Sequence, residues 1–254
     1  NGVFTNNGTL NNSDSYGKTT NNETFNIPMV GGSATGSIGG TGVLQLNKDL
    51  NITYSGTGAS TTSISCQVVL GEDRSFNIPD NGTSATDLLI SGFISGAYSI
   101  TKSGNGTLNL SGTNTFSGGS VLNTGNLILS NVAALGASAS SVTLNGGVLE
   151  LKTNSTVNTY NVTIGGNSVI NSDRFSSGAG ITHVLGSLTM GEYSITTNKG
   201  SNVTSGTTVI QFGNFTMTGN SSIITNTADV HISGTSSGTY KLTKSGAGTL
   251  KKIT

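Results

Sequence analysis

The sequence predicts an all-β fold, a parallel β-solenoid, from its composition, its short alternating segments and an internal repeat. Gly, Asn, Ser and Thr together make up about 56% of the 254 residues, and only 9% of residues are charged. Short runs alternate apolar with polar residues, and turn-forming pairs such as Asn-Gly and Gly-Gly separate them. A stack of like coils tolerates so little charge because polar side chains hydrogen-bond along the stack.

The alternating runs mark the expected strands in chain order. They comprise residues 107–110, 127–129, 142–144, 148–151, 162–164, 187–190, 194–196 and 215–217. The best helix candidate is a single turn over residues 131–136, closed by Gly136. With roughly 22 residues per coil and ~4.8 Å per coil, the chain is expected to form a rod of roughly 11 to 12 coils, about 50 to 60 Å long.

An internal repeat supports the stacking of like coils. Residues 87–108 (DLLISGFISGAYSITKSGNGTL) align without a gap with residues 229–250 (DVHISGTSSGTYKLTKSGAGTL). The spacing of 142 residues corresponds to about six coils. A shorter echo, Phe-Asn-Ile-Pro, occurs at residues 25–28 and again at residues 76–79.

Charge and hydropathy exclude several classes of partner. The formal net charge is zero, so the basic surface that phosphate binding needs is missing and a nucleic-acid partner is not expected. The longest apolar runs, such as Leu88–Ile90, are far too short to insert into a bilayer. No signal peptide opens the sequence, so any secretion signal is expected outside it. The lone Cys66 is expected to be a small wall residue of a strand.

Enzymes of this shape require paired carboxylates, or a carboxylate-bound metal with a basic catalyst. The densest charged patch is Glu72-Asp73-Arg74 with Asp80 nearby, and its turn-rich surroundings predict a solvated loop. The repeat itself duplicates two charged positions, as Asp87 with Asp229 and Lys102 with Lys244. A residue that recurs with the scaffold is expected to serve the turns of the coils.

His183 and His231 lie in alternating segments and are expected to be wall residues, so no nucleophile–histidine pair is predicted. No catalytic, cofactor-binding or metal-binding residue is therefore predicted, and no cofactor. The tyrosines leave two interpretations open, because each can stack on a sugar or pack outward on the scaffold. They are Tyr16, Tyr54, Tyr98, Tyr160, Tyr193 and Tyr240.

Residues 100–151, beginning Thr-Lys-Ser-Gly-Asn-Gly-Thr-Leu at Thr101 and ending Asn-Gly-Gly-Val-Leu-Glu-Leu, carry a family resemblance. They closely resemble the passenger-associated transport repeat (autotransporter-associated β-strand repeat) of bacterial autotransporter passenger domains. Phe116 and Ser120 stand where that repeat commonly has Tyr and Thr. A second copy begins at residue 243, and residues 243–254 hold only its start.

The resemblance implies a right-handed parallel β-helix at the cell surface, or released from the outer membrane, of a Gram-negative bacterium. Residues 1–254 would be a single β-helical segment of a longer passenger that a C-terminal outer-membrane translocator delivers. The expected function is a non-enzymatic stalk or adhesin segment that contacts host-surface or glycan ligands. Two alternatives stay open: a segment of a self-assembling extracellular filament whose coil edges stack on other copies, and a β-helical polysaccharide-active enzyme.

Overall fold

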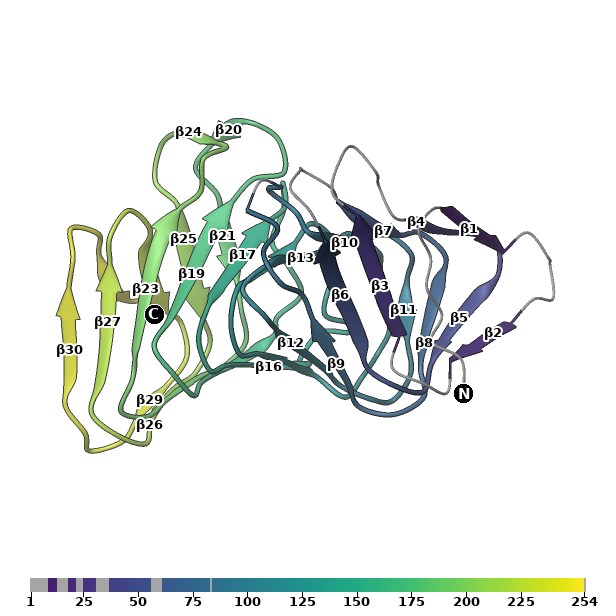
Figure 1. Ribbon diagram of the computed structural model, residues 1–254. Coiled ribbons are helices and arrows are strands. Elements are labelled where there is room, and N and C mark those ends of the chain that lie inside the picture. The colour runs from purple at the N-terminus through teal and green to yellow at the C-terminus, as the bar shows by residue number, and fades with distance from the viewer. Residues whose placement is uncertain are drawn as a thin grey trace.

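The computed structural model describes residues 9–12, 18–21, 25–30, 37–55, 61–82 and 84–253, with backbone alone for residues 54 and 55 and for the strands before residue 37. Within these ranges the chain is all-β, every pair of neighbouring strands is parallel, and no helix occurs. The strands stack into a solenoid that runs from the N-terminal to the C-terminal end of the chain (Figure 1). The predicted fold class is confirmed.

The longest sheet, here called the long sheet, forms one side of the solenoid. Its eleven strands are β1 (Thr9–Asn12), β4 (Ser37–Gly40), β7 (Thr62–Ile64), β10 (Leu88–Ile90), β13 (Thr107–Leu110), β15 (Asn126–Leu129), β17 (Val148–Lys152), β19 (Ser168–Asp173), β23 (Ser194–Lys199), β27 (Ser221–Thr225) and β30 (Leu242–Ser245).

The second sheet has ten strands and forms another side of the coil. They are β3 (Phe25–Val30), β6 (Leu50–Ser55), β9 (Arg74–Asn77), β12 (Ile100–Ser103), β14 (Ser120–Leu122), β16 (Ser141–Leu144), β18 (Asn161–Ile164), β22 (Leu188–Met190), β26 (Phe215–Met217) and β29 (Ser236–Ser237).

The third side is a sheet only near the two ends of the solenoid. Near the N-terminus it consists of β2 (Lys18–Asn21), β5 (Val43–Leu46), β8 (Gln67–Leu70) and β11 (Ile94–Ser95). Near the C-terminus it consists of β21 (Thr182–Val184), β25 (Val209–Phe212), β28 (Asp229–Ile232) and β31 (Leu250–Lys252). In the coils between them, loops close this side. A separate pair, β20 (Gly178–Ala179) and β24 (Val203–Ser205), extends beyond the long sheet (Figure 1).

The prediction of 11 to 12 coils is wrong, because the solenoid has about 9 turns. From β4, the first strand of the long sheet for which side chains are described, to β30, the chain returns to this sheet nine times. Paired residues in this sheet are separated by as few as 19 positions (Leu110 with Leu129) and as many as 28 (Ile195 with Ile223). Nine turns at ~4.8 Å give a rod of about 43 Å, shorter than predicted.

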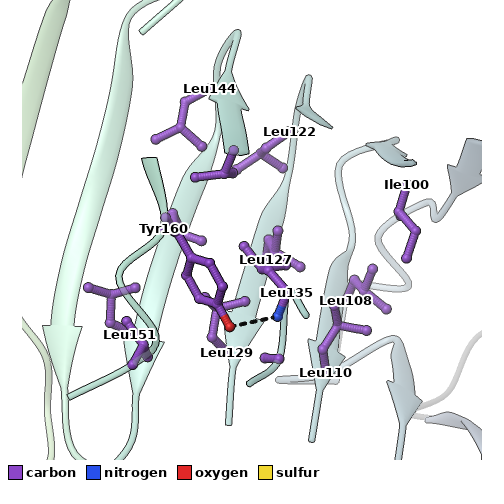
Figure 2. Close-up of a cluster of buried hydrophobic side chains, with 14 of the residues drawn as sticks. Ile100, Leu108, Leu110, Leu122, Leu127, Leu129, Leu135, Leu144, Leu151 and Tyr160 are labelled. Carbon is purple, nitrogen blue, oxygen red and sulfur yellow. Dashed lines mark hydrogen bonds between the residues drawn. The ribbon is translucent and has the colours of Figure 1, made fainter. Parts of the chain in front are cut away.

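The core consists of aliphatic side chains that stack on their equivalents in the next coil. One file in the long sheet runs through Ile64, Ile90, Leu110, Leu129 and Leu151, all in register and fully buried. Figure 2 shows part of this file with the side chains of the second sheet facing it. Each buried Leu or Ile stabilises the fold by about 1.5–3 kcal/mol relative to an exposed one, so the files hold the coils together.

Polar files complement the apolar ones, as predicted. The Asn198 amide donates to Asn171 Oδ1 at 3.1 Å, and the Asn226 amide donates to Asn198 Oδ1 at 3.2 Å. A similar bond at 2.9 Å joins Asn145 to Asn123. These amide ladders satisfy hydrogen-bonding groups without introducing charge, which accounts for the sparsely charged composition.

Both sequence repeats correspond to coil geometry. The 51-residue echo spans two coils, because Phe25 pairs with Leu50 and Leu50 pairs with Phe76 in the second sheet. The 142-residue repeat was expected to span six coils. It spans six coils and, in addition, one of the three sides of the next coil. Its first copy begins on the long sheet with β10, whereas its second copy begins on the third side with β28.

Two smaller predictions concern single elements. Residues 131–136 form a turn and not a helix, with the Gly136 amide bonded to the Ala133 carbonyl at 3.0 Å and Gly136 at φ 87°. Cys66 is a buried core residue, as predicted, and burial raises the pKa of its thiol. The described residues include no helix of the length and apolarity that crossing a bilayer requires.

Candidate functional site

The densest charged patch is a set of structural links. Arg74 is buried, and its Nε donates to the Leu46 carbonyl of the preceding coil at 3.1 Å while Nη2 contacts Glu72 Oε2 at 2.9 Å. Asp73 Oδ1 accepts the Ser99 N–H of the next coil at 2.8 Å. The Arg74 hydrogen bond lowers the pKa of Glu72, and the Ser99 N–H lowers the pKa of Asp73. A general acid needs a raised pKa, so neither carboxyl is poised for acid catalysis.

Asp80 is not joined to this patch. Its Oδ1 accepts the Gly82 N–H within its own exposed turn at 2.7 Å. The densest charged patch therefore divides into separate structural roles, with exposed carboxylates as predicted for a solvated loop but with a buried Arg74. Among the described residues, no three His, Cys, Asp or Glu side chains gather as a metal site would require.

The repeated aspartates link successive coils. Asp87 is buried, and its Oδ2 accepts the Thr107 N–H at 2.7 Å. Asp229 Oδ1 accepts the Thr249 N–H, again 20 residues later and at 2.7 Å. The two residues make the same bond on different sides of the solenoid, as expected for a coil-turn element.

The repeated lysines share one contact, to the glycine two positions further on. Lys102 Nζ donates to the carbonyls of Ser103, Gly104 and Thr124 at 2.8, 2.7 and 3.3 Å. Burial lowers the pKa of Lys102 to about 8. Lys244 donates to the Gly246 carbonyl at 2.7 Å, which is the equivalent of Gly104, but its side chain is exposed. These ammonium groups close turns through carbonyl oxygens.

His183 is fully buried inside the solenoid. Its Nδ1 lies 2.7 Å from Ser172 Oγ, and its Nε2 lies 3.1 Å from Thr153 Oγ1. Burial lowers the pKa of His183 to about 4, so the ring is neutral at physiological pH. A fully enclosed pair of hydroxyls and a neutral imidazole offers a substrate no access, and the expectation of a wall residue holds. His231 is half-buried on β28.

The tyrosines separate into two environments. Tyr160 is buried, whereas Tyr98, Tyr193 and Tyr240 are exposed. Tyr16 and the side chain of Tyr54 lie outside the described residues. Sequence could not distinguish these environments, because the alternating pattern of the coil does not extend into its loops.

A cleft of about 300 Å³ lies where three neighbouring strands of the long sheet end. The loops that follow β15, β17 and β19 form it, and each contributes residues from a different coil. This cleft is here called the step cleft. Its lining consists of Ser130, Asn131, Val132, Thr153, Asn154, Ser155 and Phe175. Sequence reasoning did not identify this group. Phe175 is the most exposed large apolar side chain of the described residues, at 64%.

A change of coil length creates the step cleft. Leu151 and Ser172 are 21 positions apart in register, whereas Ser172 and Lys199 are 27 positions apart. The additional residues of the longer coil form β20, which pairs with β24 beyond the end of the long sheet. Phe175 therefore projects from the first longer coil beside the shorter coils, which do not cover it.

Hydrogen bonds fix the lip of the cleft that carries Val132. The Tyr160 hydroxyl accepts the Leu135 N–H at 3.1 Å, drawn in Figure 2, and donates to the Val132 carbonyl at 3.0 Å. The Asn158 N–H donates to the same Val132 carbonyl at 2.8 Å. Burial raises the pKa of Tyr160 to about 12, so the group stays a hydroxyl.

The opposite lip, which carries Phe175, is fixed in a similar way. The Asn202 amide donates to the carbonyls of Arg174 and Phe175 at 2.8 and 3.2 Å. Asn154 Oδ1 accepts the Ser176 N–H at 3.1 Å, and Asn154 Nδ2 donates to Ser176 Oγ at 2.9 Å. Both lips are thus held by bonds between coils.

The chain is similar to part of one curated protein. Over 129 residues, 50% of its length, it is 30% identical to the adhesin BmaC autotransporter of Brucella suis biovar 1 (strain 1330). It spans 3% of the length of that protein. No family model matches the chain, and no solved structure matches it. The assignment of residues 100–151 and 243–254 to the passenger-associated repeat therefore stays a prediction.

Proposed function

We propose that the chain is a segment of a bacterial surface adhesin of the autotransporter type, and that it acts as a non-enzymatic scaffold for contact with other surfaces. The partial similarity to an autotransporter adhesin supports the class. The parallel solenoid supports an extended body with long side faces.

The observation that carries the non-enzymatic part is the use of the charged side chains within the scaffold. Eight of the nine described carboxylates accept a backbone N–H or pair with a cation. Six accept a backbone N–H, namely Asp49, Asp73, Asp80, Asp87, Asp173 and Asp229, and two pair with a cation, namely Glu72 and Glu150. Carboxylates already engaged in this way are unsuited to the acid–base pair of a glycoside hydrolase.

Two measurements on the 254-residue chain test this proposal. Antibodies raised against the chain should label intact, unpermeabilised cells of the source bacterium, and beads coated with the chain should attach to epithelial cells more than albumin-coated beads do. Labelling only after permeabilisation, or equal attachment of both bead types, would contradict the proposal. Release of reducing ends from a panel of polysaccharides would favour the enzyme instead.

A further inference from the structure

The step cleft has an amphipathic lining without a charged side chain. Its floor carries the hydroxyls and amides of Ser130, Asn131, Asn154 and Ser155, and its two lips carry exposed Val132 and Phe175. Thr153 also lines it, but its hydroxyl is bonded to His183 and the Ser155 carbonyl. The volume of about 300 Å³ is at the lower end of the range for small-molecule sites. The cleft therefore suits a small ligand with one apolar face and a polar edge.

The floor retains hydrogen-bonding capacity for a ligand. The Asn154 amide uses one N–H and one lone pair toward Ser176, which leaves a donor and an acceptor. Asn131 Oδ1 accepts one bond, from the Ala133 N–H at 2.9 Å, and keeps a second lone pair. The hydroxyls of Ser130 and Ser155 make no hydrogen bond to the described residues. Several neutral donors and acceptors therefore line the same cleft as the Phe175 ring.

Two cationic residues, Lys152 and Arg174, neighbour the cleft without lining it. Lys152, next to Thr153, lies 3.0 Å from Glu150 Oε1 and 3.6 Å from Asp173 Oδ2. Arg174, next to Phe175, directs Nη1 to the Ala179 carbonyl at 3.3 Å. Neither cation is among the residues that line the cleft, and the lining itself carries no charge, so it favours a neutral ligand.

From these contacts we infer that the step cleft binds one unit of a neutral carbohydrate. The apolar C–H face of a pyranose would stack on Phe175, and its hydroxyls would bond the amides and hydroxyls of the floor. Because hydrogen bonds between coils already fix both lips, little ordering is needed on binding. This inference rests on the proposed function, since the cleft would supply one of the contacts that an adhesin makes.

Saturation-transfer NMR on the full chain tests the inference with defined probes. These are the β-1,4-linked trimers of glucose, galactose and N-acetylglucosamine, with the trimer of galacturonate as the charged comparison. At least one neutral trimer should receive saturation on its ring C–H protons, and galacturonate should receive less. Phe175→Ala should weaken binding about tenfold, whereas Phe175→Tyr, which keeps the ring, should retain it.

Tyr193→Ala is the matched control, because Tyr193 is an exposed aromatic outside the cleft. Its binding should equal that of the unaltered chain. The inference is overturned if no neutral trimer receives saturation, if galacturonate alone does, or if Phe175→Ala binds as the unaltered chain does. If the unaltered chain binds no trimer but beads coated with it attach normally, the cleft alone is refuted. If those beads do not attach, the adhesin function is refuted.

Discussion

The aspartate link between coils permits a matched test, because the internal repeat supplies the same residue in two environments. Asp87 is buried and accepts two backbone N–H groups, from Thr107 at 2.7 Å and from Asn81 at 3.1 Å. Asp229 is half-buried and accepts the Thr249 N–H. A hydrogen bond to a charged group contributes about 1.5–3 kcal/mol when buried. Asp87→Ala should therefore destabilise its coil by roughly 3–5 kcal/mol, and Asp229→Ala by roughly 1–2 kcal/mol.

Hydrogen exchange with mass spectrometry is the suitable assay, because a solenoid can open coil by coil and exchange reports the opening of the coil that carries the substitution. A loss of about 3 kcal/mol corresponds to exchange that is on the order of a hundredfold faster for the amide of Thr107. Asp80→Ala is the control, since Asp80 is exposed and bonds only within its own turn. Equal effects of Asp87→Ala and Asp80→Ala on the Thr107 amide would refute the role assigned to the coil link.

Three further substitutions test the buried His183, the loop of residues 131–136 and the turn at Gly125. Because burial lowers the pKa of His183 to about 4, the unfolded chain takes up a proton between pH 6.5 and 4 that the folded chain excludes, so stability should fall as pH falls through this window. At pH 4.5 the loss in the free energy of unfolding should reach roughly 2.5 kcal/mol, measured by urea denaturation at a series of pH values. His183→Gln should remove this pH dependence, and a dependence equal to that of the unaltered chain would contradict the role of His183. Tyr160→Phe leaves the Leu135 N–H unpaired and should destabilise this loop by about 1–3 kcal/mol. Hydrogen exchange should then be faster for residues 131–136 alone. Protection equal to that of the unaltered chain would contradict the role of the Tyr160 hydroxyl in holding the loop. Gly125 has φ +72°, and a Cβ there would lie 2.4 Å from the Gly104 carbonyl oxygen. Gly82 has a similar φ of +76°, but no atom lies within 4 Å of its Cβ position. Gly125→Ala should therefore lower the melting temperature clearly more than Gly82→Ala, and similar melting temperatures would refute the close approach.

Sequence predicted the stacking because stacking depends on local, repeated contacts. The roles of Asp87 and Lys102 followed from their recurrence at Asp229 and Lys244, and the hydrogen bonds of each pair match. The number of coils could not be predicted, since the loops between strands vary in length. The sequence of a strand also does not indicate which side of the solenoid the strand joins. Phe175 was missed for the same reason, because its exposure depends on a difference in length between two neighbouring coils.

The change of side between the two repeat copies explains how the solenoid can carry a binding feature at all. Residues 87–108 supply strands to the long sheet, the third side and the second sheet in that order, whereas residues 229–250 start on the third side. The aspartate bond to the next coil and the lysine bond to the turn glycine are nevertheless present in both copies, so these two contacts do not depend on the side of the solenoid. An insertion at a corner, such as the one that forms β20, then changes the outline of one coil without breaking the bonds that stack it. Surface features like the step cleft can therefore arise by lengthening a loop, while the aliphatic and amide files that hold the rod together remain in register.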